Sequence, residues 1–284
     1  MSTLKRDASS AWSALRGVWS DLGWTSPVHS HGAFHHVAIL GATVVVRVSF
    51  AADHEERIAC QGAALLAVGA AGLKTRIPKL LRTYTGDDWS AMACTVVEGS
   101  HQADRPWHEV RDDFAGILDD LQGAQLPAGL VAVRSWCGGG SWPDVVERIT
   151  AGASSRVRKA AHFAVREVLS LDGAASPSLV HGDFGPHNIL WNESGAPGLI
   201  DFDNASVADP AVDVAPLIGF YGAAKVGEIV DADVLARAKV YRASLPLQVA
   251  AAAALGPDPQ LQSHALSNFS RRLEAGSLHD PAAN

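Results

Sequence analysis

Residues 179–215 read LVHGDFGPHNILWNESGAPGLIDFDNASVADPAVDVA and carry most of the information about the fold. Three polar residues stand at fixed offsets among apolar ones: Asp183, then Asn188, then Asp201. Between the last two lie ILW, the turn sequence NESGAPG and LI, which predict a β-hairpin. A hairpin brings Asn188, at the start of one strand, beside Asp201, at the end of the other. The loop before the hairpin then presents Asp183 to the same point in space.

This arrangement has the parts that phosphoryl transfer needs. One carboxylate must orient the attacking hydroxyl and accept its proton, and two oxygen ligands must hold Mg²⁺ against the phosphates. Asparagine and aspartate both offer hard oxygen donors, and positioning and charge stabilisation supply most of the catalysis. The stretch therefore indicates a phosphotransferase site.

The same residues match a known family. H-G-D-x-x-x-x-N at 181–188, I-D-F-D at 200–203 and A-D-P-x-x-D at 208–213 closely resemble the aminoglycoside phosphotransferase family. Its members are small-molecule kinases with a protein-kinase-like bilobal fold. The resemblance implies Mg²⁺ as cofactor, ATP or GTP as co-substrate, and a small-molecule hydroxyl as acceptor.

The resemblance also assigns roles to single residues. It implies that Asp183 is the catalytic aspartate and that Asn188 and Asp201 are the magnesium ligands. Three further family positions are expected to support the site structurally: His181, Asp213 and, at a recurring acidic position with a less defined role, Asp203.

The rest of the chain predicts an α+β protein with two lobes. After an opening helix at 7–23, strands at 34–40 and 43–50, a helix at 53–70 and a strand–turn–strand unit at 76–99 give the order β-β-α-β-β. That order is typical of a small antiparallel sheet with one helix against it. Beyond it, helices are expected at 107–121, 142–150, 155–171 and through 210–273. We expect a nucleotide-binding lobe at 1–97 and a helical lobe with the catalytic loop, metal site and acceptor site at 98–284.

The N-terminal lobe matches the family in order more than in residues. Arg47, in the strand sequence VVVRVSF, occupies the position of the cation that binds the nucleotide phosphates. The helix glutamate that usually pairs with it is missing, because Gly62 falls at its position; Glu55, one to two turns earlier, is the nearest replacement. The phosphate-covering loop at 30–36 has a single glycine, and its backbone amides at 31–34 are candidates to face phosphates. Backbone groups of Thr95 and Val97 are expected to bind the base.

Composition excludes several other classes. The 284 residues include 23 Lys and Arg against 30 Asp and Glu, a formal net charge of −7, which argues against a nucleic-acid partner. Three widely spaced cysteines without a CxxC pair indicate neither a disulfide framework nor a zinc site. The sequence shows no signal-peptide pattern and no apolar run long enough for a membrane span, so we expect a cytoplasmic protein without a membrane partner.

The acceptor itself stays open. The resemblance favours an aminoglycoside or macrolide antibiotic, and it leaves a homoserine-, choline- or sugar-kinase-like metabolite kinase as an alternative. The missing helix glutamate and the sparse glycine loop favour a second alternative, a regulatory nucleotide-binding pseudoenzyme. Paired carboxylates that could bind a polycationic acceptor are Asp112 with Asp113, Asp119 with Asp120, and Asp231 with Asp233.

Overall fold

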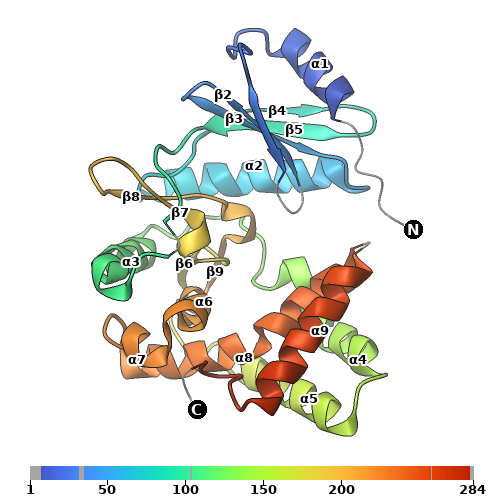
Figure 1. Ribbon diagram of the computed structural model, residues 1–284, viewed down its shortest axis with the longest axis vertical. Coiled ribbons are helices and arrows are strands. Elements are labelled where there is room, and N and C mark those ends of the chain that lie inside the picture. Colours follow the sequence, from blue (N-terminus) through green and yellow to red (C-terminus); the bar gives the residue numbers. More distant parts are fainter. Residues whose placement is uncertain (1–7, 32–34, 103, 257, 282–284) are drawn as a thin grey trace.

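The structure is a computed structural model that describes residues 8–31, 35–102, 104–256 and 258–281. Figure 1 shows an N-terminal lobe, built from an antiparallel sheet and two helices, above a larger and mainly helical lobe. The expected α+β organisation, with the sheet first and the helices after it, is confirmed. No helix within the described ranges is long and apolar enough to cross a membrane.

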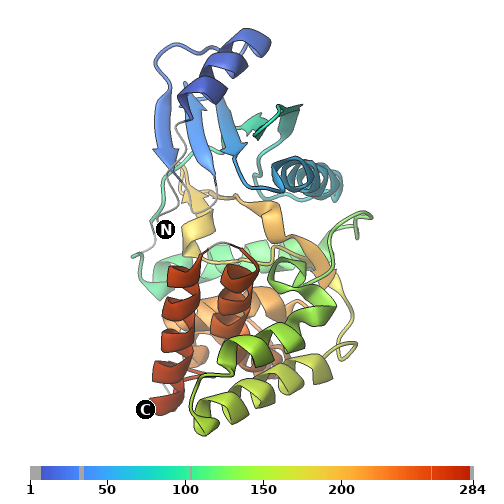
Figure 2. The same cartoon turned by 90° about the vertical axis from the view of Figure 1, so that its right-hand side faces the viewer.

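The sheet of the N-terminal lobe is antiparallel throughout. Its strands lie side by side in the order β1 (Val28–His31), β2 (His36–Leu40), β3 (Val44–Ser49), β5 (Ser90–Thr95) and β4 (Leu80–Thr85). Figure 2 shows α1 (Ser9–Val18) and α2 (His54–Ala70) on opposite faces of this sheet. The strand β1 was not expected from the sequence, whereas the other strands and α2 were.

The strand β3 divides its side chains between the two faces of the sheet. Successive side chains of a strand alternate, so Val44, Val46 and Val48 enter the apolar cluster that the sheet forms with α1. Val45 packs instead against the second apolar cluster, which α2 forms together with the helical lobe. Arg47 lies on this second face, and its side chain therefore points toward α2 and the helical lobe.

The helical lobe surrounds two small pieces of sheet. Its helices are α3 (Trp107–Gly123), α4 (Trp142–Thr150), α5 (Ser155–Ser170), α6 (Ala211–Tyr221), α7 (Ala223–Val226), α8 (Ala232–Leu255) and α9 (Pro259–Glu274). The strand β6 (Ser178–Val180) pairs with β9 (Ser206–Ala208), and β7 (Ile189–Trp191) pairs with β8 (Pro197–Leu199). The second pair is the hairpin predicted between the two candidate magnesium ligands, with Ile189 opposite Leu199.

The linker between the lobes is bonded to this hairpin. Ser100 and Trp191 exchange two backbone hydrogen bonds, of 3.0 and 3.1 Å. Just before them, Gly99 has φ +135°, and a Cβ there would lie 2.7 Å from the Trp191 backbone. Only glycine fits at this point, since any side chain would collide with the hairpin and force an unfavourable φ. The hairpin is therefore fixed to the linker.

Candidate active site

His181 organises the loop that carries Asp183. Its ring is fully buried; Nε2 donates to the Ile200 carbonyl at 2.8 Å, and Nδ1 accepts the backbone N–H of Asp183 at 3.2 Å. Because a backbone N–H can only donate, Nδ1 is the acceptor and the ring proton lies on Nε2. The ring thus connects the loop that carries Asp183 to the end of the hairpin strand that leads into Asp201.

Asp213 binds the backbone of the same loop. Its carboxylate, in the first turn of α6, accepts the backbone N–H groups of His181 at 2.7 Å and Gly182 at 2.8 Å. Burial raises the pKa of Asp213 to about 6, although His181 and both N–H groups favour the ionised form. His181 and Asp213, which the sequence analysis expects to support the site, thus both contact the loop that carries Asp183.

Gly182 permits the sharp turn before Asp183. Its φ is +85°, and a Cβ at this position would lie 2.2 Å from the carbonyl oxygen of Asn204. The loop therefore runs directly against η4 (Phe202–Asn204), the short 3₁₀ turn that follows Asp201. Glycine is required here for both reasons, conformation and space.

The Asp183 side chain stands at the centre of the site, and it is half-exposed. Asn188 Nδ2 donates to the Asp183 backbone carbonyl at 2.8 Å and to Oδ2 at 3.3 Å, and His187 Nε2 lies 3.4 Å from Oδ2. Burial opposes ionisation of Asp183, but the contacts with His187, His181 and Asn188 lower its pKa overall. The carboxylate is thus held as an anion that can accept a proton from a hydroxyl placed next to it.

The hairpin places Asn188 and Asp201 as the sequence predicts. Asn188 accepts the backbone N–H of Ile200 at 3.0 Å, so it lies opposite the residue that precedes Asp201. Its side-chain Nδ2 donates to Asp183, and this leaves the side-chain Oδ1 available as a metal ligand. Asp201 adopts the left-handed conformation, with φ 68° and ψ 60°, and its carboxylate is exposed.

These two oxygens fit a small, hard cation. An amide oxygen and a carboxylate are the kinds of ligand that hold Mg²⁺, together with water, in phosphoryl-transfer sites. In the part of the chain that the structure describes, no three His, Cys, Asp or Glu side chains gather into a metal site of another kind.

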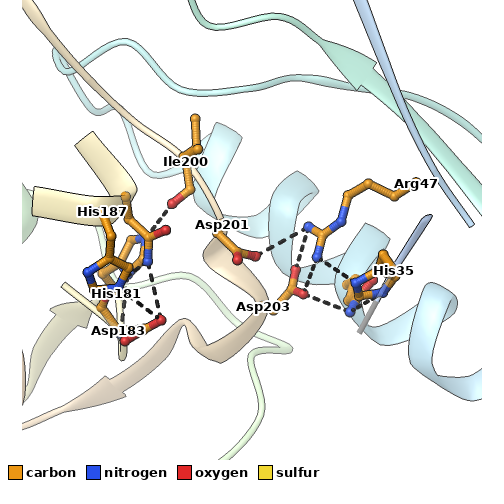
Figure 3. A network of polar contacts seen from close by, with 10 residues as sticks. His35, Arg47, His181, Asp183, His187, Ile200, Asp201 and Asp203 are labelled. Carbon is orange, nitrogen blue, oxygen red and sulfur yellow. Dashed lines mark hydrogen bonds and ion pairs between the residues drawn. The ribbon is translucent and has the colours of Figure 1, made fainter. Parts of the chain in front are cut away.

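Arg47 reaches this site from the sheet (Figure 3). Its guanidinium contacts two carboxylates, that of Asp201 just before η4 and that of Asp203 within η4. Nη1 lies 3.3 Å from Asp201 Oδ1, while Asp203 is bound through Nη1 at 3.0 Å and Nη2 at 2.5 Å. Burial raises the pKa of Asp203 to about 6, with Arg47 opposing that shift and Asp201 adding to it. Both oxygens of the Asp203 carboxylate face the guanidinium.

Two further residues complete this contact. Gln61 of α2 donates from Nε2 to Asp203 Oδ2 at 2.7 Å, and His35 Nδ1 lies 3.1 Å from Arg47 Nη2. Burial, followed by the charge of Arg47, lowers the pKa of His35 to about 3, so this ring is neutral. Sequence reasoning singled out Gly62 and Glu55 on α2 but passed over Gln61. Glu55 is exposed and makes no contact with Arg47.

Thr95 and Val97, the two residues expected to bind the base, differ in whether their backbone groups are already hydrogen-bonded. The Thr95 N–H donates to the Lys79 carbonyl at 2.9 Å, and its hydroxyl accepts the Lys79 N–H, so both groups are engaged within the sheet. The backbone N–H and C=O of Val97 have no hydrogen-bond partner among the described residues. The loop amides considered for phosphate binding fall largely at 32–34, outside the described residues.

Two of the three carboxylate pairs considered for the acceptor have one member engaged in another contact. Asp113 accepts the indole N–H of Trp191 at 2.8 Å, and Asp120 accepts the backbone N–H groups of Lys74 and Thr75. What lies beside Asp183 is aromatic instead. The ring of His187 is 5.8 Å from that of Phe220, at the end of α6, and Phe220 is 53% exposed. His187 was not among the residues singled out from the sequence.

The sheet lobe, the helical lobe and this loop–hairpin site define a kinase-like fold, and solved structures share it. Aminoglycoside 2'-phosphotransferase-IIIa with GDP aligns with a TM-score of 0.73 at 15% identity, covering 94% of this chain and 99% of its own. A thermostable mutant of aminoglycoside phosphotransferase APH(4)-Ia, with ADP and hygromycin B, aligns with a TM-score of 0.68 at 16% identity, covering 93% and 99%.

Comparison of the sequence with known families and proteins identifies the family of the chain. A model of the phosphotransferase enzyme family matches residues 28–247, and the chain belongs to that family. Viomycin phosphotransferase of Streptomyces vinaceus is 30% identical over 118 residues, which cover 37% of this chain and 41% of the relative. The aligned part thus spans less than half of that curated relative. The family expected from the catalytic motifs is confirmed.

Proposed function

We propose that the protein transfers the γ-phosphoryl group of ATP or GTP to a hydroxyl of a small molecule, with Mg²⁺ as cofactor. The observation that supports this best is the setting of Asp183. Its carboxylate is half-exposed, ionised and fixed by Asn188, and its backbone is fixed by His181. A group held in this way can orient an entering hydroxyl and take its proton as the oxygen attacks the phosphorus.

The other residues act on the nucleotide. Arg47 neutralises the charge of the phosphates, and its planar fork suits phosphate oxygens better than a point charge does. The free N–H and C=O of Val97 can bind the edge of the base, as expected for a linker between lobes. Asn188 and Asp201 would hold Mg²⁺, which supplies charge neutralisation at the transferred group.

The acceptor we propose is a hydroxyl-bearing antibiotic. Two of the similar proteins point this way by name: the curated relative is a viomycin phosphotransferase, and a solved neighbour binds kanamycin. A neighbour that binds hygromycin B adds a further antibiotic of this kind. The exposed aromatic pair His187 and Phe220 lies next to Asp183, where an acceptor ring would rest.

The experiment is nucleoside diphosphate release with Mg²⁺ and ATP or GTP. The panel contains aminoglycosides, viomycin, a macrolide and simple metabolite alcohols, with Asp183→Asn as the inactive control. Release that depends on one acceptor class and vanishes in the control supports the proposal and names the acceptor. Release no greater than the control with every acceptor, despite nucleotide binding, supports the pseudoenzyme instead.

One motive for the pseudoenzyme is weakened by the structure. The absent helix glutamate left Arg47 without an expected anionic partner, yet Asp203 supplies a carboxylate at 2.5 Å. The cation is therefore positioned despite that departure from the family pattern.

A further inference from the structure

The environment of Arg47 differs from that of the corresponding cation in most kinases. In the protein-kinase arrangement a strand lysine pairs with a glutamate of the neighbouring helix, and this pair must form for activity. Here the helix residue next to the site is Gln61, whose side chain is buried and carries no charge. The neighbouring His35 is neutral, so neither residue can balance the charge of Arg47.

The balancing carboxylate comes from the other lobe. Asp203 binds Arg47 through both of its oxygens, at 3.0 and 2.5 Å, in the two-pronged geometry that fixes a guanidinium most firmly. The two side chains are 16% and 23% exposed, so water screens their attraction only partly. Gln61 in turn donates to the Asp203 oxygen that faces Arg47 Nη2.

We propose that Asp203 is the positioning residue for Arg47 and replaces the helix glutamate, with Gln61 holding the Asp203 carboxylate in place. This inference rests on the proposed role of Arg47 in binding nucleotide phosphates. Asp203 acts through Arg47 and touches neither substrate. Because Asp203 follows the candidate metal ligand Asp201 by two residues, the contact also fixes the guanidinium relative to the metal site.

The contact has a direct structural consequence. Arg47 belongs to the sheet and Asp203 to the helical lobe (Figure 3), so their pair forms only when the two lobes lie together. A helix glutamate would hold the cation within the N-terminal lobe alone. In this chain the cation is in position only in the closed arrangement.

The test removes the carboxylate at position 203 and introduces one on α2. Four variants are compared with the wild-type protein: Asp203→Asn, Gln61→Glu, the double variant Gln61→Glu/Asp203→Asn, and Glu56→Gln as a control on an exposed position of α2. The first readout is the Kd of ADP, with and without Mg²⁺, by calorimetric titration. The second is the KM for nucleotide and for acceptor, together with kcat. Urea unfolding reports whether each variant folds.

We expect Asp203→Asn to weaken ADP binding at least tenfold in both conditions, while the acceptor KM changes less than twofold. The double variant should recover most of that loss, because the glutamate introduced on α2 then supplies the carboxylate that Asp203→Asn removed, while Asp201 keeps its own contact with Arg47. Gln61→Glu alone should not bind more tightly, since the guanidinium already contacts Asp201 and Asp203, and a third carboxylate competes with them. Glu56→Gln should behave like the wild-type protein.

Either of two results overturns the inference: Asp203→Asn binds ADP as tightly as the wild type, or the double variant binds no better than Asp203→Asn. If Asp203→Asn does not fold, the double variant is compared with the wild type directly, and ADP binding more than tenfold weaker overturns the inference. Failure of both to fold also overturns it, because Asp203 then maintains the fold rather than the cation. ADP binding needs no acceptor, so a wild-type protein that binds ADP but phosphorylates nothing in the panel contradicts the proposed function alone.

Discussion

The imidazole of His187 lies against the carboxylate of Asp183, with 3.4 Å between Nε2 and Oδ2. Each group changes the protonation of the other. The hydrogen bond that His187 donates to Asp183 raises the pKa of His187, and the same contact is the main influence that lowers the pKa of Asp183 against the effect of burial. The contact is therefore strongest where His187 is protonated and Asp183 is ionised.

Stability should reflect this contact in a defined pH range. The folded pKa of His187 is raised above its unfolded value of about 6.5, so its contribution is fully present below that value. The contribution is lost as pH rises through the folded pKa. We expect His187→Gln to cost roughly 0.5 kcal/mol at pH 5.5 and almost nothing at pH 9, because both side chains are half-exposed and screened. Urea unfolding at both pH values measures this, with His264→Gln, at an exposed position of α9, as control. Equal losses at both pH values would contradict the prediction.

Removing the charge of Asp183 should affect chemistry and leave nucleotide binding unchanged. Asp183→Asn keeps the size of the side chain and the backbone contact with His181, but it cannot accept a proton. We expect kcat to fall by roughly 10²–10⁴-fold, the range typical of general-base catalysis, with the Kd of ADP within twofold of the wild type. Initial rates and calorimetric titration on the same preparation separate the two effects. A variant that keeps most of its kcat removes Asp183 from the mechanism.

The two candidate metal ligands should control the effect of magnesium. If ADP at a hundred times its Kd stabilises the wild-type protein with Mg²⁺, linkage gives about 2.7 kcal/mol. Asp201→Asn and Asn188→Ala should each lose most of the part of this stabilisation that depends on Mg²⁺. Thermal unfolding with ADP is compared in Mg²⁺ and in EDTA. Stabilisation that depends equally on Mg²⁺ in wild type and variants would show that the ion binds elsewhere.

A matched pair of glycine substitutions tests the turn before Asp183. Gly182→Ala places a Cβ 2.2 Å from the Asn204 carbonyl at φ +85°, so we expect activity to fall sharply and stability to drop by several kcal/mol, on the order of a severe backbone clash. Gly116→Ala, inside α3 with open space around its Cβ, should stabilise by up to about 1 kcal/mol. Urea unfolding and initial rates report both. Similar behaviour of the two variants would refute the role assigned to Gly182.

The parts of the site that are close in sequence could be predicted. Asn188 and Asp201 flank one hairpin, and its turn composition and apolar strands are visible in the sequence. Arg47 could be placed because VVVRVSF is rich in β-branched residues and predicts a strand, and the family resemblance expects the phosphate-binding cation on that strand. The expected helix at 142–150 and the start of the helix at 155 also agree with α4 and α5, since both have strong apolar periodicity.

The contacts between distant segments could not. Gln61 immediately precedes Gly62, the position that the family pattern indicates. The rotation of α2 about its axis decides which of these two residues points toward the site, and that rotation is set by the packing of Ile58, Leu65 and Val68. Arg47 and Asp203 are 156 residues apart, and no local pattern indicates that they pair. The strand β1 escaped prediction because VHSH has a single apolar residue and its only described partner is β2.

The cross-lobe pair of Arg47 and Asp203 also bears on the rate of turnover. In the proposed function ADP leaves from between the sheet and the helical lobe, and a lobe separation that frees it would break this ion pair and expose both charges. Product release limits kcat in many enzymes that close over their substrates. We therefore expect the strength of this one contact to set a trade-off: a tighter pair favours the phosphoryl-transfer step and delays the departure of the spent nucleotide.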